Sequence, residues 1–281
     1  MPKPLRLLIQ TTIPFVADDW HAGRFSKLAN HLAELPGVEV AARDRGTHAG
    51  VDDPVLAHID TSDVDELWLF AVDTGDGLTT AECAAIGRFR QRGGGLMATR
   101  DHMDLGSSIC TLGGVGAAHY FHSRNPDPDD SRRRRDDELT RDIDWPNYHS
   151  GANGDFQTVS VTGPRHPTLE GVDRLPAHPH EGAVGAPPDD PSARVIATGV
   201  SQVTGRTFNL AVAFERSAAG GRAIAQSTFH HFADYNLDPA QGCPSFVTEA
   251  PGEGFARTPA ALADTYRYFG NLARWLAPDA P

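Results

Sequence analysis

Short apolar runs alternate with amphipathic stretches through the first part of the chain. Leu5–Gln10 and Glu66–Val72 are almost continuously apolar, which is typical of strands buried on both faces of a parallel sheet. Between them, Asp18–Leu35 carries apolar side chains at helical spacing, and Val38–Ala42 is a further short apolar run. The pattern predicts strand, helix, strand and strand in that order.

A second helix and a fourth strand continue this pattern. Thr79 and Glu82 have the spacing of a capping box, in which each side chain can bind the other residue's backbone amide. The helix behind them ends at glycines 93–95, and Leu96–Thr99 is the next apolar run. The alternation of strand and helix predicts an α/β fold with a mostly parallel sheet and right-handed crossovers.

The pattern changes in the second half of the chain. Residues 125–155 are rich in Pro, Asp, Arg and Asn without a usable period, which predicts a long insertion loop. Some antiparallel edge strands should follow, and then a closing helix from about Thr258 to Leu276. The expected strands are Phe156–Val161, Arg194–Thr198, Phe208–Phe214 and Arg222–Phe229, the last two joined by a hairpin at Gly220-Gly221. Because neither a repeat nor a linker divides the chain, we expect a single domain over residues 1–281.

Charge and cysteine content narrow the classes of partner. The 281 residues carry 25 basic and 37 acidic side chains, for a net charge of -12, which disfavours nucleic acid and anionic membranes as partners. The basic run Arg132–Arg135 precedes three acidic residues and is interpreted as a solvated loop. Three widely spaced cysteines argue against a disulfide framework. Because no segment reaches membrane length, we expect a cytoplasmic protein.

Polar side chains concentrate where the expected strands end. In open parallel sheets, ligands bind outside the carboxyl ends of the strands. Arg100, Asp101 and His102 follow the fourth strand in succession; a buried strand has no need of them, although an ordinary polar turn is the alternative reading. Thr11 and Thr12 follow the first strand at the same edge.

A second cluster ends the last long strand. His230 and His231 are adjacent, so on a continuing strand they would face opposite sides and only one would reach a given pocket. One of the two is therefore expected to be structural. Asp234 could orient a neighbouring imidazole.

Thirteen histidines raise the question of a metal site. No closely spaced metal motif is present, so a site for a divalent metal such as zinc would have to be assembled in three dimensions. We expect His102, His149 and His230 as its ligands. The remaining histidines are interpreted as hydrogen-bonded structural residues; they include His119, His122, His178 and His180.

Cysteine chemistry has little support in the sequence. Cys83 falls on a helix, Cys110 lies eight positions beyond His102, and Cys243 falls in a loop. The GxSxG elbow, the Walker motif and the GxGxxG fingerprint are all absent.

Several stretches, in order, span nearly the whole chain and resemble one family. They are Trp20-His21 with the helix behind it, Leu67–Val72 with its acidic loop, Gly93–Ala98, Gly113-Gly114 followed by His119, His166-Pro167 leading to His180-Glu181, and Gly221–His230. In this order they are similar to the ThuA-like (trehalose-utilisation) branch of the class I glutamine amidotransferase-like superfamily.

The resemblance implies a flavodoxin-like sheet with helices on both faces. It also implies that His230 takes the place of the catalytic histidine and that the nucleophile elbow falls at Thr99–Asp101. The amidotransferases have a cysteine at this elbow, and this turn has none, so glutaminase chemistry through a thioester is not expected. ThuA-like proteins are associated with sugar metabolism.

Two classes of function remain open. In the first, an enzyme hydrolyses or isomerises a small polar metabolite, with Asp101 or His102 as general base and His230 or His231 as acid partner. A bound divalent metal is a variant of this hypothesis. We expect four residues to bind the substrate, and Tyr148 and His149 to belong to a lid formed by the insertion. The four are Thr12, Arg100, Tyr148 and Glu181.

The alternative is a non-catalytic module that binds a ligand or a partner and retains the fold. The missing cysteine favours the module, whereas the dense ionisable clusters favour the enzyme. In both cases the expected partner is a small molecule. Trp145 and Tyr148 would equally suit a pocket or the interface of a homo-oligomer.

Overall fold

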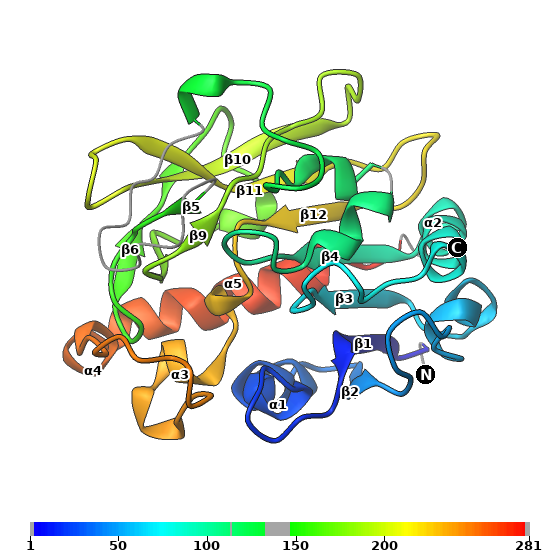
Figure 1. The fold of residues 1–281 in the computed structure, drawn as a ribbon, viewed down its shortest axis with the longest axis horizontal. Coiled ribbons are helices and arrows are strands. Elements are labelled where there is room, and N and C mark those ends of the chain that lie inside the picture. Colours follow the sequence, from blue (N-terminus) through cyan, green and yellow to red (C-terminus); the bar gives the residue numbers. More distant parts are fainter. Residues whose placement is uncertain (1–2, 113, 133–146, 279–281) are drawn as a thin grey trace.

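An eight-stranded sheet runs through the centre of the computed structural model, which describes residues 3–112, 114–132 and 147–278 (Figure 1). In spatial order the strands are β2 (Val38–Arg45), β1 (Leu5–Pro14), β3 (Glu66–Phe70), β4 (Gly95–Thr99), β12 (Ala223–Gln226), β11 (Thr207–Phe214), β10 (Ala193–Val200) and β7 (Ser160–Val161). The first five run parallel, and the pairs from β12 to β7 are antiparallel. The parallel order β2-β1-β3-β4-β12 is the flavodoxin-like order 2-1-3-4-5.

Helices cover both faces of this sheet (Figure 1). They are α1 (Ser26–Ala33), α2 (Thr80–Gln91), α3 (Asp234–Leu237), α4 (Gly254–Arg257) and α5 (Pro259–Leu276). Successive side chains of a strand face opposite sides, so Trp68 and Phe70 of β3 pack in the core that includes α1 and α5. Leu67 and Leu69 pack in the core under α2. The predicted fold class, a mostly parallel α/β sheet with antiparallel strands at one side, is confirmed.

The capping box predicted for the second helix is present. The hydroxyl of Thr79 accepts a hydrogen bond from the Glu82 amide, and the Thr79 amide donates to the Glu82 carboxylate at 2.8 Å. The same carboxylate pairs with Arg45, and both side chains are buried. The box therefore fixes the start of α2 and ties it to the end of β2.

Some predicted elements have different boundaries in the structure. The helix expected over Asp18–Leu35 is a short 3-10 turn followed by α1. The strand expected over Phe156–Val161 divides into β6 and β7, which belong to different sheets. The strand expected to reach Phe229 ends at Gln226, and Phe229–His231 forms a 3-10 helix that Thr228 caps. The hairpin between β11 and β12 is present as predicted.

Two small antiparallel sheets lie beside the main sheet and position the segment that contains His178. They pair β5 (Asn147–Tyr148) with β9 (Glu181–Gly182), and β6 (Phe156–Thr158) with β8 (Arg174–Pro176). The short 3-10 helices are Ala22–Phe25, Leu56–Thr61, Ser107–Leu112, Gly116–Ala118, Asp130–Arg132, Pro167–Leu169, Phe229–His231 and Pro239–Gln241. Most of the basic run interpreted as a solvated loop, Arg133–Arg135, lies outside the described residues, and so does Trp145, expected in a pocket or an interface.

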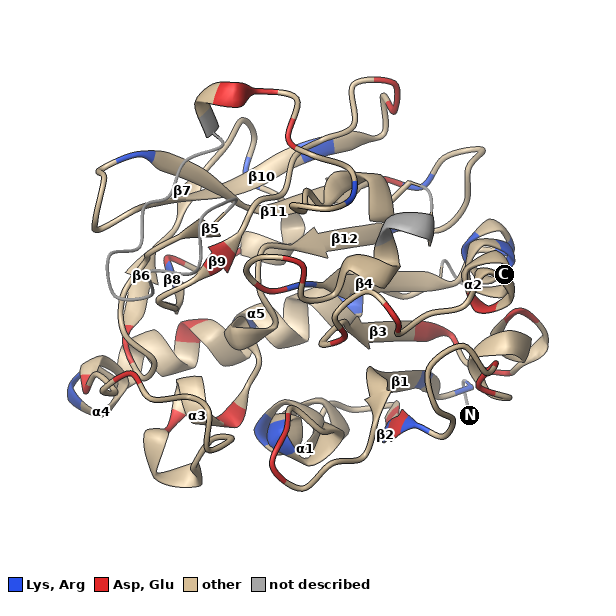
Figure 2. Cartoon of the chain, in the orientation of Figure 1, with Lys and Arg blue, Asp and Glu red and all other residues tan. Residues whose placement is uncertain are grey.

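Charged residues lie mainly on the helices and loops around the sheet (Figure 2). A carboxylate at the start of β9 is an exception, because Glu181 has no exposed surface. Among the described residues, no helix is both long enough and apolar enough to cross a membrane.

Candidate functional site: a carboxylate facing three imidazoles

The ends of β4 and β12 meet at the carboxyl edge of the parallel sheet. The two strands are neighbours, with Thr99 opposite Gln226. Beyond them, the Phe229 amide donates to the Arg100 carbonyl at 2.8 Å. The Thr228 hydroxyl donates to Oδ1 of Asp101 at 3.2 Å. Both strand ends predicted to form the site are therefore joined by direct hydrogen bonds.

Arg100 shapes the turn that follows β4. Its side chain has no exposed surface, and its guanidinium donates to the backbone carbonyls of Asp101, Met103 and Tyr120. Met103 adopts the left-handed region, with φ of 51°, which is uncommon for a residue with a side chain. The buried arginine therefore holds a tight turn, and the substrate contact expected for it stays a prediction.

Asp101 lies among three histidine rings. Its Oδ2 atom is 3.0 Å from Nδ1 of His102 and 3.6 Å from Nε2 of His230, and its Oδ1 atom is 3.5 Å from Nε2 of His178. The rings of His178 and His230 stack with their centroids 3.6 Å apart. One carboxylate is thus shared by imidazoles from three separate segments of the chain.

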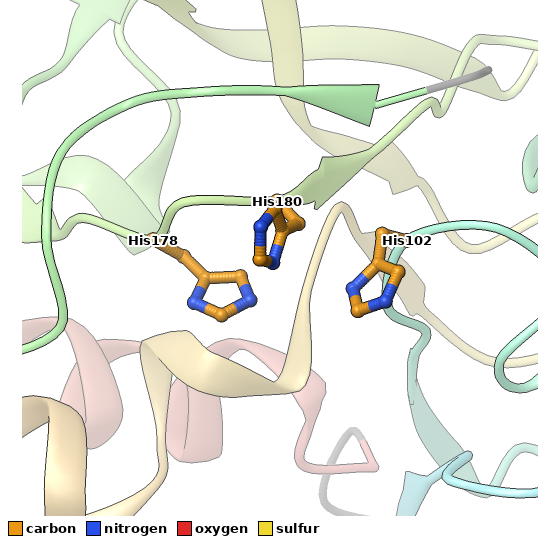
Figure 3. A group of neighbouring side chains, drawn as sticks. All are labelled: His102, His178 and His180. Atoms are coloured by element: carbon orange, nitrogen blue, oxygen red, sulfur yellow. The ribbon is translucent and has the colours of Figure 1, made fainter. Parts of the chain in front are cut away.

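His178 and His180 come from the irregular segment between β8 and β9. Figure 3 shows their rings, together with that of His102, at the place where this segment faces the turn after β4. The His180 ring lies edge-on to both others, with centroids 4.8 Å from His102 and 5.4 Å from His178. The Nε2 atom of His180 is 3.7 Å from a carboxylate oxygen of Glu249.

Two asparagines orient the stacked rings. Oδ1 of Asn153 lies 2.9 Å from Nδ1 of His178, and Oδ1 of Asn236 lies 2.7 Å from Nδ1 of His230. The Asn236 amide nitrogen donates to Asn153 Oδ1 at 2.7 Å and to the Ala177 carbonyl at 3.4 Å, which fixes its carbonyl oxygen toward His230. Each Nδ1 therefore carries a proton that it donates to its asparagine, and each Nε2 is directed toward Asp101.

Asp101 and the four histidines around it form the floor of a cavity of about 230 Å³. Its walls combine the polar cluster with Trp20 and with a loop that contributes Phe246, Val247 and Glu249. Trp20 is nearly buried and lies edge-on to the His230 ring at 4.7 Å. None of the described residues that line the cavity is a cysteine.

A larger hollow of about 710 Å³ lies elsewhere, beside the end of α2 and the turn that leads into β12. Arg90, Asp189 and Asp190 supply its charged side chains, and no described histidine lines it. Because it lies at the amino edge of the parallel strands, it lacks the convergent strand ends that favour a ligand site. We therefore assign the site to the smaller cavity.

Burial and neighbouring charges shift the pKa values in the smaller cavity. Burial opposes ionisation of Asp101, but His102 and His230 outweigh it and hold the pKa of this carboxyl well below its usual value. Burial lowers the pKa of His178 well below its ordinary value, and the adjacent His230 acts in the same direction. At neutral pH the floor therefore combines an ionised carboxylate with a neutral His178.

The predicted site residues divide into two groups. Asp101, His102 and His230 line the cavity, whereas His149 is not among the lining residues and belongs to neither group of clustered potential metal ligands found among the described residues. His178 and His180 take part instead. Their His-Pro-His spacing was the only signal in the sequence, and it was too short to separate them from structural histidines.

His231 and Glu181 form a separate buried network. Nε2 of His231 lies 3.2 Å from Oε2 of Glu181, and neither side chain has exposed surface. Glu181 also accepts hydrogen bonds from Ser150, Gln157 and Ser227. These contacts give both residues a role in packing, and neither is among the residues that line the cavity.

The other predicted binding residues also have structural contacts. The Thr12 hydroxyl is buried and accepts from the Val72 amide at 3.0 Å. Tyr148 stacks on Phe208 with ring centroids 4.8 Å apart. Asp234 does not orient an imidazole, because its carboxylate accepts from the amides of Ser26 and Lys27 at the start of α1.

The similarity of this chain to known proteins is confined to solved structures. No protein-family model matches the sequence, and neither does any curated protein. Among solved structures, the chain is similar to the glutaminase domain of Trypanosoma brucei CTPS with bound acivicin, at 12% identity and a TM-score of 0.49, over 96% of this chain and 94% of that chain.

A second neighbour is the exo-beta-1,4-mannosidase Op5Man5 from Opitutaceae bacterium strain TAV5. The identity is 11% and the TM-score 0.38, over 95% of this chain but only 35% of that chain. At such identities neither neighbour transfers an activity to this chain, so its function has to be argued from its own site.

Proposed function

We propose that the protein is a hydrolase of a small polar metabolite and that the reaction takes place in the Asp101 cavity. The observation that carries the proposal is the contact between Asp101 and His102. A buried, ionised carboxylate 3.0 Å from Nδ1 can fix the orientation of the imidazole. The opposite nitrogen of His102 is then available as a general base.

The remaining groups of the cavity suit the second proton transfer. His180 lies across from His102 and is paired with Glu249, so it can hold a proton for the leaving group. In the proposed reaction, water oxygen bonds to the electrophilic carbon while its proton passes to His102. The bond to the leaving group breaks, and that group receives a proton from His180.

The size and lining of the cavity favour a small, hydroxyl-rich substrate. A volume of about 230 Å³ accommodates a molecule of roughly the size of a single sugar ring. The indole of Trp20, beside several hydrogen-bonding groups, suits a ligand with both an apolar face and polar edges. A carbohydrate-related substrate and membership of the ThuA-like branch are parts of this proposal, as is a cytoplasmic location, which the cysteine content supports.

A panel of small glycosides, lactones, esters and amides, followed by NMR in H₂¹⁸O, tests the proposal. Hydrolysis predicts a product labelled with ¹⁸O and a loss of about 100-fold or more in kcat/KM for Asp101→Asn. Asp63→Asn is the matched control, because Asp63 is exposed and pairs with Arg6 at the amino end of β3. Equal turnover by Asp101→Asn and wild type would exclude this site.

The alternative function is a module that binds the same kind of ligand without converting it. The buried floor that favours catalysis would also bind a polyol by hydrogen bonds. Saturable binding without ¹⁸O incorporation, lost in Asp101→Asn, would establish the module and refute the hydrolase. Product formed without ¹⁸O, together with exchange of a carbon-bound proton with solvent, would instead indicate an isomerase.

A further inference from the structure

The contacts between Asp101 and the two stacked histidines are too long for good hydrogen bonds. Oδ1 of Asp101 lies 3.5 Å from Nε2 of His178, and Oδ2 lies 3.6 Å from Nε2 of His230. Hydrogen bonds to a carboxylate are usually shorter than about 3.0 Å. These three side chains are therefore held near one another without bonding each other directly.

The same distances match the edges of a metal coordination shell. Zn²⁺ binds imidazole nitrogen and carboxylate oxygen at about 2.0–2.2 Å, so neighbouring ligand atoms of a tetrahedral site lie about 3.3 Å apart. The ligand atoms of Asp101, His178 and His230 all lie within 4.8 Å of one another, and all three residues are buried. Because the rings of His178 and His230 stack with an interplanar angle of 14°, both rings would rotate to direct their Nε2 lone pairs at one ion between them.

The surroundings of the two histidines also fit a metal site. The His178 side chain is only 5% exposed, and its Nε2 atom has no hydrogen-bond partner among the described residues. Leaving such an atom unpaired is costly unless a ligand satisfies it. The Nδ1 atoms donate to Asn153 and Asn236, which is the arrangement by which second-shell groups fix the tautomer of metal-binding histidines.

We propose that Asp101, His178 and His230 bind one divalent transition-metal ion, such as Zn²⁺, and leave a coordination position open toward the cavity. Two imidazoles and one carboxylate form a known donor set for catalytic zinc and for non-haem iron. An open position would hold a water molecule, whose pKa the ion lowers. His102, which contacts Oδ2 of Asp101 through its Nδ1 atom, keeps its Nε2 atom available as the base of the proposed hydrolase.

A second cluster competes for the ion. Potential ligand atoms of His102, His178 and His180 also lie within 4.8 Å of one another. This cluster lacks a carboxylate, and His180 is already paired with Glu249. The Asp101 cluster offers the negative charge that balances the cation and contains both rings supported by asparagines, so the structure favours it.

Titration of chelator-treated protein with Zn²⁺ alone, by calorimetry with metal analysis after dialysis, tests this proposal. We expect one tightly bound equivalent for wild type, and at least 100-fold weaker binding for His178→Ala and His230→Ala. His149→Ala is the matched control, because His149 lies outside the cavity lining, and its affinity should stay within threefold of wild type. No stoichiometric binding by wild type, or unchanged binding by His230→Ala, would overturn the proposal.

Two further variants guard against a loss that comes from misfolding. Asn236→Ala should weaken Zn²⁺ binding by about 10-fold to 100-fold, because Nδ1 of His230 loses the oxygen that accepts its proton. His180→Ala should leave the affinity nearly unchanged; a loss with His180→Ala as large as that with His178→Ala would place the ion in the competing cluster. The assay contains no substrate, so it can fail or succeed independently of the proposed hydrolase.

Discussion

Thr228, just beyond β12, donates its hydroxyl to Oδ1 of Asp101, just beyond β4, at 3.2 Å. The same hydroxyl accepts from the His230 amide at 3.1 Å and caps the 3-10 helix that carries His230. One side chain therefore sets the position of the carboxylate and of an imidazole that faces it. The relationship explains how two strand ends far apart in the sequence form one site.

Thr228→Ala should remove both hydrogen bonds. We expect a loss of about 1–2 kcal/mol in the free energy of unfolding and about tenfold weaker Zn²⁺ binding, whereas Thr228→Ser should stay near wild type. Urea denaturation and calorimetry measure the two effects. An affinity unchanged in Thr228→Ala would show that Thr228 does not position Asp101.

Arg100→Lys should destabilise the protein although the substitution keeps the positive charge. A lysine cannot reproduce the planar fork that reaches the carbonyls of Asp101, Met103 and Tyr120. We expect a loss of at least about 3 kcal/mol in urea denaturation, because buried acceptors lose their donors. The exposed Arg88, changed to lysine, provides the control. A fully stable Arg100→Lys protein that has lost only ligand binding would support the predicted substrate role of Arg100.

Glu181→Gln should affect stability more than the cavity. The amide cannot accept from Ser150, Gln157 and Ser227 as a carboxylate does, and the carboxylate that faces His231 is lost. Roughly 2–3 kcal/mol of stability should disappear, since hydrogen bonds to charged groups contribute about this much. Zn²⁺ affinity should stay within threefold. The reverse result, intact stability with lost binding, would return Glu181 to the site.

His119 should make the protein less stable as the solution becomes acidic. Its ring is fully buried, and burial lowers the pKa to about 3 from the ordinary value of 6.5. Between these two values the unfolded chain binds the proton and the folded chain does not, so stability falls as pH falls below 6.5. His119→Asn retains a donor for the Val115 carbonyl but cannot be protonated in this range.

The control for this prediction is His119→Asn, measured at the same two pH values as the wild type. From pH 6.5 to pH 5, wild type should lose about 2 kcal/mol more than His119→Asn, because one unit of pKa shift corresponds to about 1.4 kcal/mol. Parallel stability curves for the two proteins would contradict the prediction. Denaturant titrations at both pH values supply the comparison.

Much of the fold could be predicted because its strands are buried on both faces. Apolar runs such as Glu66–Val72 and Leu96–Thr99 have few other interpretations, and glycines 93–95 mark the boundary between α2 and β4. The predicted strand continues to Phe229, beyond the end of β12 at Gln226, because residues 227–229 keep a strand-like composition. Only the cap made by Thr228 shows where the chain turns.

Half of the site could be predicted from the strand ends, and the rest could not. Asp101, His102 and His230 follow buried strands directly, so topology brings them together. His178 lies on an irregular segment that has no periodicity, and only the tertiary fold brings it to Asp101. Asn153 and Asn236, which support the two rings, cannot be found from the sequence either, since a lone polar residue seldom indicates a partner 83 positions away.

The most direct test of this account is the anomalous difference map of a crystal grown with Zn²⁺ and measured at the zinc absorption edge. We predict one strong peak about 2.0–2.2 Å from Nε2 of His178, Nε2 of His230 and a carboxylate oxygen of Asp101. A cavity without a peak, or a peak held by other residues while these three side chains keep the positions described, would contradict it.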